Sequence, residues 1–282
     1  LFKLLLEHVE SYPDNSDEPL KMQVSSLAYD DYLGRLGIGR ITRGTIKPAT
    51  PYVVSKRDGS VETIKIGKLY VNEGLSKVEK DIAYAGDIVT FSGVPLISIG
   101  ETICDKDHIE PMEMIEIEKP TLAMNFLVND GPFVGRSGKL VTTRQIRARL
   151  IKELETNIGL EVEELDGIEG YKVSGRGELH LSILLENMRR EGFEMAVGKP
   201  KVVFREINGE KCEPYEILTV DLEDEHQGAA MEELGRRRGE MLNMESDGNG
   251  RTRLEYKIPA RGLIGFQGEF LTMTRGNGLM GH

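Results

Sequence analysis

The 282-residue sequence predicts a multidomain protein of the β and α+β classes, with a small β-barrel followed by two split βαβ domains. Three observations predict this fold. Residues 21–107 contain one short strand pattern after another and no convincing helix, residues 121–204 follow the order βαββαβ, and the same order begins again at Tyr215. A chain of this length is expected to form two or three domains, each with its own core.

The barrel prediction rests on short segments of alternating polarity that are separated by turn signals. Residues 22–27 and 38–46 alternate apolar and polar side chains, as strands with one buried face do. Turn sequences at Arg57–Ser60 and Asn72–Gly74 separate further strands. Many short antiparallel strands can remove their unpaired edges by closing into a barrel. The further strands expected are 52–55, 61–66, 68–71 and 85–91.

The region after Pro120 mixes strands and helices. Apolar residues recur four apart in its first expected helix, and Thr142 or Thr143 can cap the first turn. The second expected helix follows a two-glycine turn and ends at Gly192. This order indicates a split βαβ, or ferredoxin-like, domain. Its expected elements are strand 121–128, loop 131–138, helix 142–157, strands 160–165 and 170–174, helix 178–190 and strand 194–204.

A second ferredoxin-like domain is expected after Tyr215. A last helix with Leu263, Phe266 and Phe270 on one face contains three glycines and therefore depends on packing. The chain ends at about the place where the final strand should lie, so this second copy could be incomplete. The elements expected before it are strand 217–222, helix 228–242, a turn at 246–250 and strand 251–258.

These patterns predict four segments. The first nine residues have the pattern of an amphipathic helix that ends a preceding domain, and residues 11–19 are a linker rich in Pro, Asp and Ser. Since the chain begins with that helix rather than with Met, we expect it to be a fragment. The predicted boundaries are 1–19 for the helix and linker, 20–118 for the barrel, 119–206 for the first split βαβ domain and 207–282 for the second.

Composition excludes several classes of function. The net charge of −11 argues against a globally basic nucleic-acid binder and against DNA as a partner. No apolar run approaches the roughly 18 residues of a membrane span, and no signal peptide is present. Cys104 and Cys212 are far apart and form no CxxC pair, so a reducing cytoplasm is the expected compartment.

Charge is nevertheless unevenly distributed along the chain. Residues 136–152 carry six basic residues and no acidic one, whereas residues 153–170 carry seven acidic residues and no basic one. A second basic cluster lies at Arg236–Arg238. Its three cations cannot all face solvent, so they are expected to meet a binding partner or a carboxylate. Arginine matches phosphate oxygens well, so these clusters indicate phosphate binding or a solvated face. No aromatic residue marks base stacking, so RNA contacts are expected to be to backbone and shape.

Motifs that would indicate catalysis are incomplete. Gly138-Lys139 is followed by Leu140, and Phe133 stands where a phosphate loop needs its first glycine. Gly276–Gly281 matches GxGxxG in letters, but no βαβ unit follows it. His180 beside Glu178 has no nearby nucleophile, and we interpret it as a packed or polar helix residue. Cys104 and His108 are too few for a metal site, so no catalytic residue and no metal ligand is predicted.

Seven short stretches resemble the translational GTPases downstream of their G domain and, within that group, the BipA (TypA) family. The resemblance covers essentially the whole chain, and the stretches that begin at Glu225 and Arg261 separate this family from elongation factor G and LepA. The stretches are Gly37–Gly44, Ser174–Leu181, Asn187–Glu194, Arg205–Gly209, Glu225–Gly228, Arg261–Phe266 and Phe270–Thr274.

The resemblance implies a translation-factor-type barrel followed by two ferredoxin-like domains, and a cytoplasmic ribosome-bound factor for large-subunit assembly and for growth in the cold or under other stress. It implies that GTP and Mg²⁺ bind a G domain ahead of Leu1, that this chain has no cofactor or GTPase activity of its own, and that a further domain follows His282. The residues expected to contact ribosomal RNA are Arg136, Lys139, Arg144, Arg147, Arg176, Arg236, Arg237, Arg261 and Arg275.

Three alternatives remain open from the sequence. The chain could be the same region of an elongation factor G or LepA type GTPase. It could be a small-molecule regulatory module, since split βαβ domains often pair to bind amino acids or nucleotides. It could also be a hydrolase built around Glu178 and His180.

Overall fold

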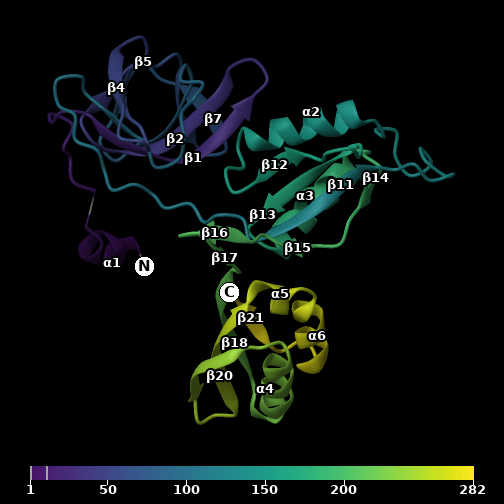
Figure 1. Ribbon diagram of the computed structural model, residues 1–282. Helices are drawn as coiled ribbons and strands as arrows, with labels where there is room; N and C mark the ends of the chain where they lie inside the picture. The colour runs from purple at the N-terminus through teal and green to yellow at the C-terminus, as the bar shows by residue number, and fades with distance from the viewer. Residues whose placement is uncertain (1, 11) are drawn as a thin grey trace. The chain divides into compact units, whose positions relative to one another are not determined.

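The structure is a computed structural model that describes residues 2–10 and 12–282. Its internal contacts divide the chain into two compact units. The first comprises Leu1–Ile117 with Ile151–Ile158, and the second comprises Glu118–Leu150 with Gly159–His282. Helix α1 (Phe2–His8) forms where the sequence predicts it, and none of its residues is buried (Figure 1). Leu1 of that predicted helix and Ser11 of the predicted linker lie outside the described residues.

The first unit is built from short antiparallel strands. Eight of them pair in the order β5-β4-β10-β1-β2-β9-β6-β7, and the sheet curls around one core (Figure 1). Apolar side chains from nearly every strand meet inside, among them the fully buried Met22, Phe91 and Ile103. The strands are β1 (Lys21–Asp30), β2 (Gly34–Arg43), β4 (Pro51–Ser55), β5 (Val61–Lys65), β6 (Leu69–Glu73), β7 (Ser76–Glu79), β9 (Ile88–Phe91) and β10 (Thr102–Cys104), with β3 (Thr45–Ile46) and β8 (Ala83–Tyr84) as a separate pair.

The second unit begins with the predicted βαββαβ order. Its sheet runs β12-β13-β11-β14, with β15 also paired to β11. Phe126, Ile146, Val173 and Leu184 are buried and come from both strands and helices, which gives this sheet its core. The elements are β11 (Leu122–Val128), α2 (Thr143–Leu154), β12 (Glu161–Glu164), β13 (Gly170–Gly175), α3 (Glu178–Arg190), β14 (Met195–Val197) and β15 (Lys201–Val202).

Two of the boundaries predicted for this region are wrong. The single strand expected over 194–204 is two strands, β14 and β15, that pair with different parts of β11. Pro200 lies between them, and proline has no N–H to give to the ladder. The first helix ends at Leu154 rather than at residue 157.

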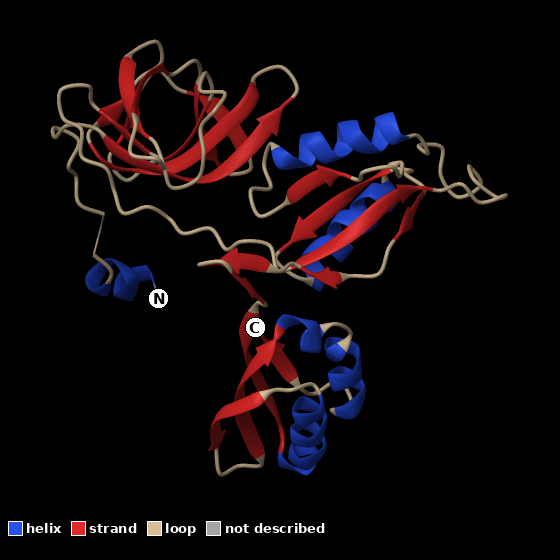
Figure 2. Ribbon diagram, in the orientation of Figure 1, coloured by secondary structure: helices blue, strands red, loops and turns tan. Residues whose placement is uncertain are grey.

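The second half of this unit repeats the order. After the hairpin of β16 (Arg205–Ile207) and β17 (Glu210–Cys212), a four-stranded sheet runs β19-β20-β18-β21. Helices cover one face of this sheet (Figure 2), and Leu218, Leu254, Phe266 and Phe270 form part of the core between them. The elements are β18 (Tyr215–Glu223), the 3₁₀ turn η1 (Asp224–His226), α4 (Gln227–Arg236), β19 (Glu240–Ser246), β20 (Arg251–Pro259), α5 (Ala260–Leu263), α6 (Phe266–Met273) and β21 (Leu279–Gly281).

Three details differ from the prediction here. Helix α4 ends at Arg236, and residues 240–246, of which 240–242 were predicted as helix, form strand β19. The last predicted helix is two short helices, because Gly265 between them has a φ of +72°. The final strand is present as β21, which pairs with β18, so this copy is not missing its last strand. Within residues 2–10 and 12–282, no helix is both long enough and apolar enough to cross a membrane.

Candidate nucleic-acid interface

The loop between β11 and α2 is held by one carboxylate. Glu194, just before β14, accepts hydrogen bonds from the backbone N–H groups of Gly135 at 3.1 Å, Ser137 at 2.8 Å and Gly138 at 3.0 Å. It also accepts one from Asn129 Nδ2 at 2.7 Å. These donors favour the ionised form and lower the pKa of the Glu194 carboxyl below its ordinary value. Glu194 therefore fixes both ends of the loop.

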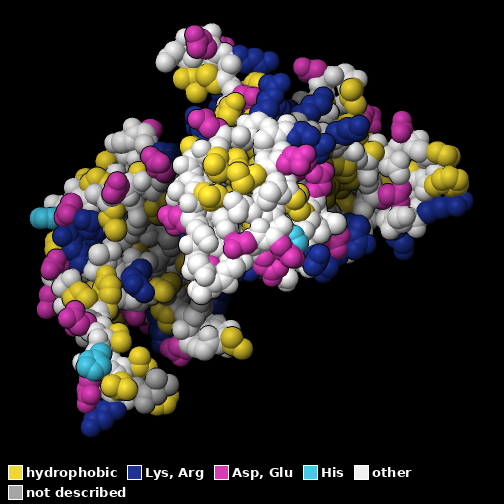
Figure 3. Space-filling model, turned by 90° about the horizontal axis from the view of Figure 1, so that it is seen from below, with side chains coloured by type: hydrophobic (Ala, Val, Ile, Leu, Met, Phe, Trp, Pro, Cys, Tyr) yellow, Lys and Arg dark blue, Asp and Glu magenta, His cyan; other side chains and the backbone are white. Residues whose placement is uncertain are grey.

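The tip of this loop presents an aromatic ring together with cations. Phe133 and Val134 are exposed at 63% and 44%, and the Arg136 guanidinium lies 4.6 Å from the centre of the Phe133 ring. Neither Arg136 nor Lys139 has a carboxylate within ion-pair distance among the described residues. In Figure 3 hydrophobic and basic side chains occur together at the right-hand tip of the molecule. The sequence-based interpretation that no aromatic residue accompanies the basic residues is therefore wrong, because Phe133 lies beside Arg136.

Helix α2 adds cations beside the loop. Thr142 caps the helix in the predicted way, since its side chain and that of Gln145 bond reciprocally to each other's backbone N–H groups. Arg144, in the first turn, is exposed and has no carboxylate partner within the described part of the chain. Arg147 pairs with Glu164 at 3.1 Å, and both side chains are exposed. We name Phe133, Arg136, Lys139 and Arg144 the loop-tip surface.

The two-glycine turn at the start of α3 is stabilised from within. His180 Nδ1 accepts the backbone N–H of Arg176 at 3.3 Å, and the Thr121 hydroxyl donates to the Arg176 carbonyl at 2.6 Å. Glu178 accepts the Gly265 N–H at 3.0 Å within the same unit. These contacts give Glu178 and His180 structural roles and weaken the hydrolase alternative. The Arg176 side chain is exposed and lies over Gly159, where a Cβ would approach its Nε to 2.7 Å.

The cations of the last sheet have carboxylate partners inside the chain. Arg237 is largely buried and bonds Glu233, Glu269 and the carbonyl oxygens of Gly262 and Ile264. Arg236 also pairs with Glu233, as expected for crowded cations. Arg237 is therefore a structural residue, although the sequence singles it out as an RNA contact.

The two remaining candidates are exposed and ion-paired. Arg261 pairs with Glu213, and Arg275 lies 3.3 Å from Glu225. Their charges are thus partly neutralised within the chain. Of the nine predicted contacts, Arg136, Lys139, Arg144 and Arg176 have no carboxylate partner in the part of the chain that the structure describes. The first three come from one loop and the helix that follows it.

Known proteins resemble this chain over nearly all its residues. Residues 210–282 match the family described as elongation factor G C-terminus. The relatives of this chain include proteins named large ribosomal subunit assembly factor BipA. Those of Salmonella typhimurium and Haemophilus influenzae are 49% and 51% identical over 280 residues, which is 99% of this chain and 46% of each relative. That of Bacillus subtilis is 48% identical over 282 residues, 100% of this chain and 46% of the relative.

The chain is thus similar to BipA proteins over nearly all of its own residues. It spans about half the length of the curated relatives that it matches, 46% in each case. The predicted resemblance to BipA is confirmed. The only support left for the elongation factor G and LepA alternative is the match of residues 210–282 to the elongation factor G C-terminus family.

Two of the stretches that carry the BipA resemblance have clear structural roles. Asn187–Glu194 ends helix α3 and delivers the Glu194 carboxylate to the loop after β11. Arg261–Phe266 makes the break between α5 and α6, where Arg237 binds two carbonyl oxygens. Sequence reasoning missed Glu194, because its partners lie 56 to 65 residues away and no local pattern relates them. Phe133 could have been identified from the sequence, because it is an aromatic residue only three positions before Arg136.

Proposed function

We propose that this chain is the ribosome-binding scaffold of a BipA-type translational GTPase, with a translation-factor-type barrel followed by two ferredoxin-like domains. The observation that carries the proposal is the 49% identity, over 99% of the chain, to proteins named large ribosomal subunit assembly factor. Ribosomal RNA and ribosomal proteins are the proposed partners, in the cytoplasm. The GTPase reaction, with GTP and Mg²⁺, is proposed for a G domain elsewhere in the whole protein. A role in growth in the cold or under other stress belongs to the same proposal.

The loop-tip surface supports RNA as the partner. It combines cations that lack internal carboxylates with an exposed ring, in a chain of net charge −11. Arginine and lysine bind phosphate, and an exposed aromatic face can stack on an unpaired base. The Glu194 carboxylate accepts hydrogen bonds from the backbone of the loop, so the loop is already ordered. It therefore loses little conformational freedom when it binds RNA.

Cosedimentation with purified ribosomes over a range of salt concentrations tests the proposal. We expect the chain to pellet with ribosomes in a salt-sensitive manner, and Arg136→Ala, Lys139→Ala and Arg144→Ala each to reduce the salt slope by about one unit. Arg189→Ala is the matched control. It removes the same charge from an exposed position, but Arg189 is already paired with Glu186 through two bonds.

Two outcomes would contradict the proposal. If the chain does not pellet with ribosomes at low salt, the scaffold role fails. If Arg189→Ala weakens binding as much as Arg136→Ala does, binding follows overall charge and the loop-tip surface is not the site. A metabolite that raises the melting temperature of a chain that does not bind ribosomes would instead favour the regulatory alternative.

A further inference from the structure

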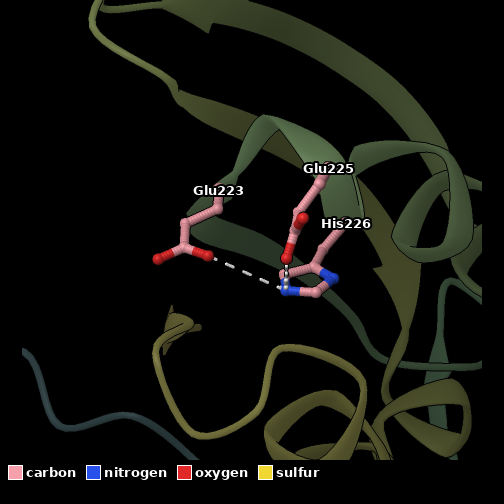
Figure 4. A group of neighbouring side chains, drawn as sticks. All are labelled: Glu223, Glu225 and His226. Carbon is pink, nitrogen blue, oxygen red and sulfur yellow. Dashed lines mark ion pairs between the residues drawn. The ribbon is translucent and has the colours of Figure 1, made fainter.

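Three electron-rich atoms converge where strand β18 passes into helix α4. His226 Nε2 lies 3.2 Å from Glu225 Oε1 and 3.8 Å from Glu223 Oε2 (Figure 4). All three side chains come from four consecutive residues, because the 3₁₀ turn η1 brings positions 223, 225 and 226 to one side. No other such group of three His, Cys, Asp or Glu ligand atoms occurs among the described residues.

The imidazole nitrogen at the centre of this group has no hydrogen-bond partner. His226 is 8% exposed, and its Nε2 atom is buried without a donor or acceptor in the described part of the chain. A buried polar atom of this kind is costly and calls for a partner. The contact with Glu225 does not provide one, since its geometry is not that of a hydrogen bond despite the short distance.

A metal ion between the three atoms would give the buried imidazole nitrogen a partner and would offset the charges of the two carboxylates. A tetrahedral zinc ion with bonds of about 2.0–2.1 Å separates its ligands by about 3.3 Å. The 3.2 Å between His226 Nε2 and Glu225 Oε1 is close to this value, whereas Glu223 Oε2 at 3.8 Å has to move closer. One imidazole and two carboxylates form a donor set that suits Zn²⁺.

We propose that Glu223, Glu225 and His226 bind a divalent transition-metal ion of the zinc type. The two glutamates are partly exposed and can close on the ion by rotating about their own side-chain bonds, whereas the buried His226 is fixed. Three protein ligands leave the fourth tetrahedral position open to water or to an anionic ligand. The proposal rests on this group alone and does not depend on ribosome binding.

Neighbouring residues define how the site differs from an ordinary ion-pair cluster. Arg275 Nη1 lies 3.3 Å from Glu225 Oε1, the same oxygen that faces His226. The Glu223 carboxylate uses its other oxygen, Oε1, to accept Asn277 Nδ2 at 3.4 Å. The guanidinium of Arg275 therefore competes with the metal for Glu225. Removing that charge is expected to strengthen metal binding, whereas it would weaken a cluster held only by ion pairs.

Calorimetric titration of the untagged, metal-free chain with ZnCl₂ tests the site. We expect one equivalent to bind, and His226→Ala, Glu225→Gln and Glu223→Gln each to weaken the affinity by roughly a hundredfold, since loss of an outer-shell partner alone costs about 10–100-fold. The two glutamine variants keep the buried histidine and are expected to fold. Arg275→Gln should bind Zn²⁺ more tightly. Glu232→Gln, on the exposed face of α4, and His108→Ala are the controls and should leave the affinity unchanged.

Substitution by CoCl₂ and histidine NMR give a second readout. Tetrahedral Co²⁺ produces strong visible absorption, which should appear with the original chain and with Glu232→Gln but not with Glu225→Gln. The Nε2 resonance of His226 should shift on addition of Zn²⁺. The proposal is overturned if Zn²⁺ does not bind at millimolar concentration, if binding is equal in the His226 and His108 variants, or if Nε2 of His226 stays protonated throughout the titration.

Discussion

The carboxylate of Glu194 accepts the backbone N–H of Ser137 at 2.8 Å, which joins the start of β14 to the loop that follows β11. Two further backbone N–H groups and one side-chain amide donate to the same carboxylate. A loop of glycines and exposed side chains would otherwise sample many conformations. The loop-tip surface is therefore shaped by a residue that is not itself part of it.

Replacing Glu194 should loosen this loop without changing the cations that it carries. Glu194→Gln keeps the size of the side chain but removes the negative charge and one acceptor oxygen. We expect faster hydrogen exchange at the Gly135, Ser137 and Gly138 amides, and weaker ribosome binding with an unchanged salt slope. Glu191→Gln, at the end of α3, is a nearby control. Equal exchange rates in Glu194→Gln and in the original chain would show that the Glu194 carboxylate does not hold the loop.

The same contact predicts a dependence on pH. The folded-state pKa of Glu194 is depressed below its ordinary value of 4.5, so its ionised form is favoured in the folded loop. A depressed pKa adds stability that is present above pH 4.5 and is lost as the pH falls through the folded-state pKa. Amide exchange in the loop, corrected for intrinsic rates, should therefore accelerate as the pH falls below 4.5, and Glu194→Gln should remove this acceleration.

The ring of Phe133 should add to binding beyond what charge provides. It is 63% exposed and lies beneath the guanidinium of Arg136, a position from which it can stack on an unpaired base. We expect Phe133→Ala to weaken binding of a large-subunit rRNA fragment by about 1–3 kcal/mol, and Phe133→Trp to retain it. Fluorescence anisotropy measures this. Val134→Ala is the control for lost apolar area, and equal losses in the two alanine variants would exclude stacking.

Much of the fold could be predicted because its patterns are local. Alternation of apolar residues identified β1 and β2, turn signals separated β4, β5 and β6, and four-residue spacing identified helix α2, whereas β7 and β10 were not predicted. The apolar face predicted for the last helix is also confirmed, since Leu263, Phe266 and Phe270 are all buried. A helix can break at a left-handed glycine and still bury one continuous side, as the two helices beside Gly265 do.

The end of α4 could not be predicted because its stop signal is unusual. Arg238 has a φ of +65°, and the next residue, Gly239, donates its N–H to the Leu234 carbonyl at 2.8 Å, as in a Schellman motif. Glycine usually occupies the left-handed position of that motif, but here an arginine does. The apolar Met241 and Leu242 therefore looked like a continued helix, although they lie exposed in β19.

The candidate sites depended on contacts that no sequence pattern records. Which arginines are available to a partner is decided by distant carboxylates, such as Glu269 for Arg237 and Glu213 for Arg261. Local spacing correctly indicated crowding at Arg236 and Arg237, which share Glu233. It could not indicate that one of the two is buried against carbonyl oxygens.

Arg237 should therefore affect stability more strongly than Arg236 does. Arg237→Ala leaves the carbonyl oxygens of Gly262 and Ile264 without their donor, which we expect to cost about 1–3 kcal/mol. Arg237→Lys should restore little of this, because an ammonium group cannot reproduce the planar fork. Hydrogen exchange at the Leu254 and Tyr256 amides reports on this sheet. Arg236→Ala removes only an exposed ion pair with Glu233 and should change those rates much less, and equal effects in both alanine variants would contradict the assignment.

Glu233, which both of these arginines contact, should make the last sheet less stable in acid. Hydrogen bonds from Arg236 and Arg237 lower its pKa from 4.5 to about 2. Because the folded-state pKa lies below the unfolded one, the ionised carboxylate stabilises the fold fully above pH 4.5, and this stabilisation disappears as the pH falls toward 2. The difference in melting temperature between the original chain and Glu233→Gln should therefore be largest above pH 4.5 and should shrink steadily below it. A difference that is constant over this range would show that the two arginines do not hold the ionised form.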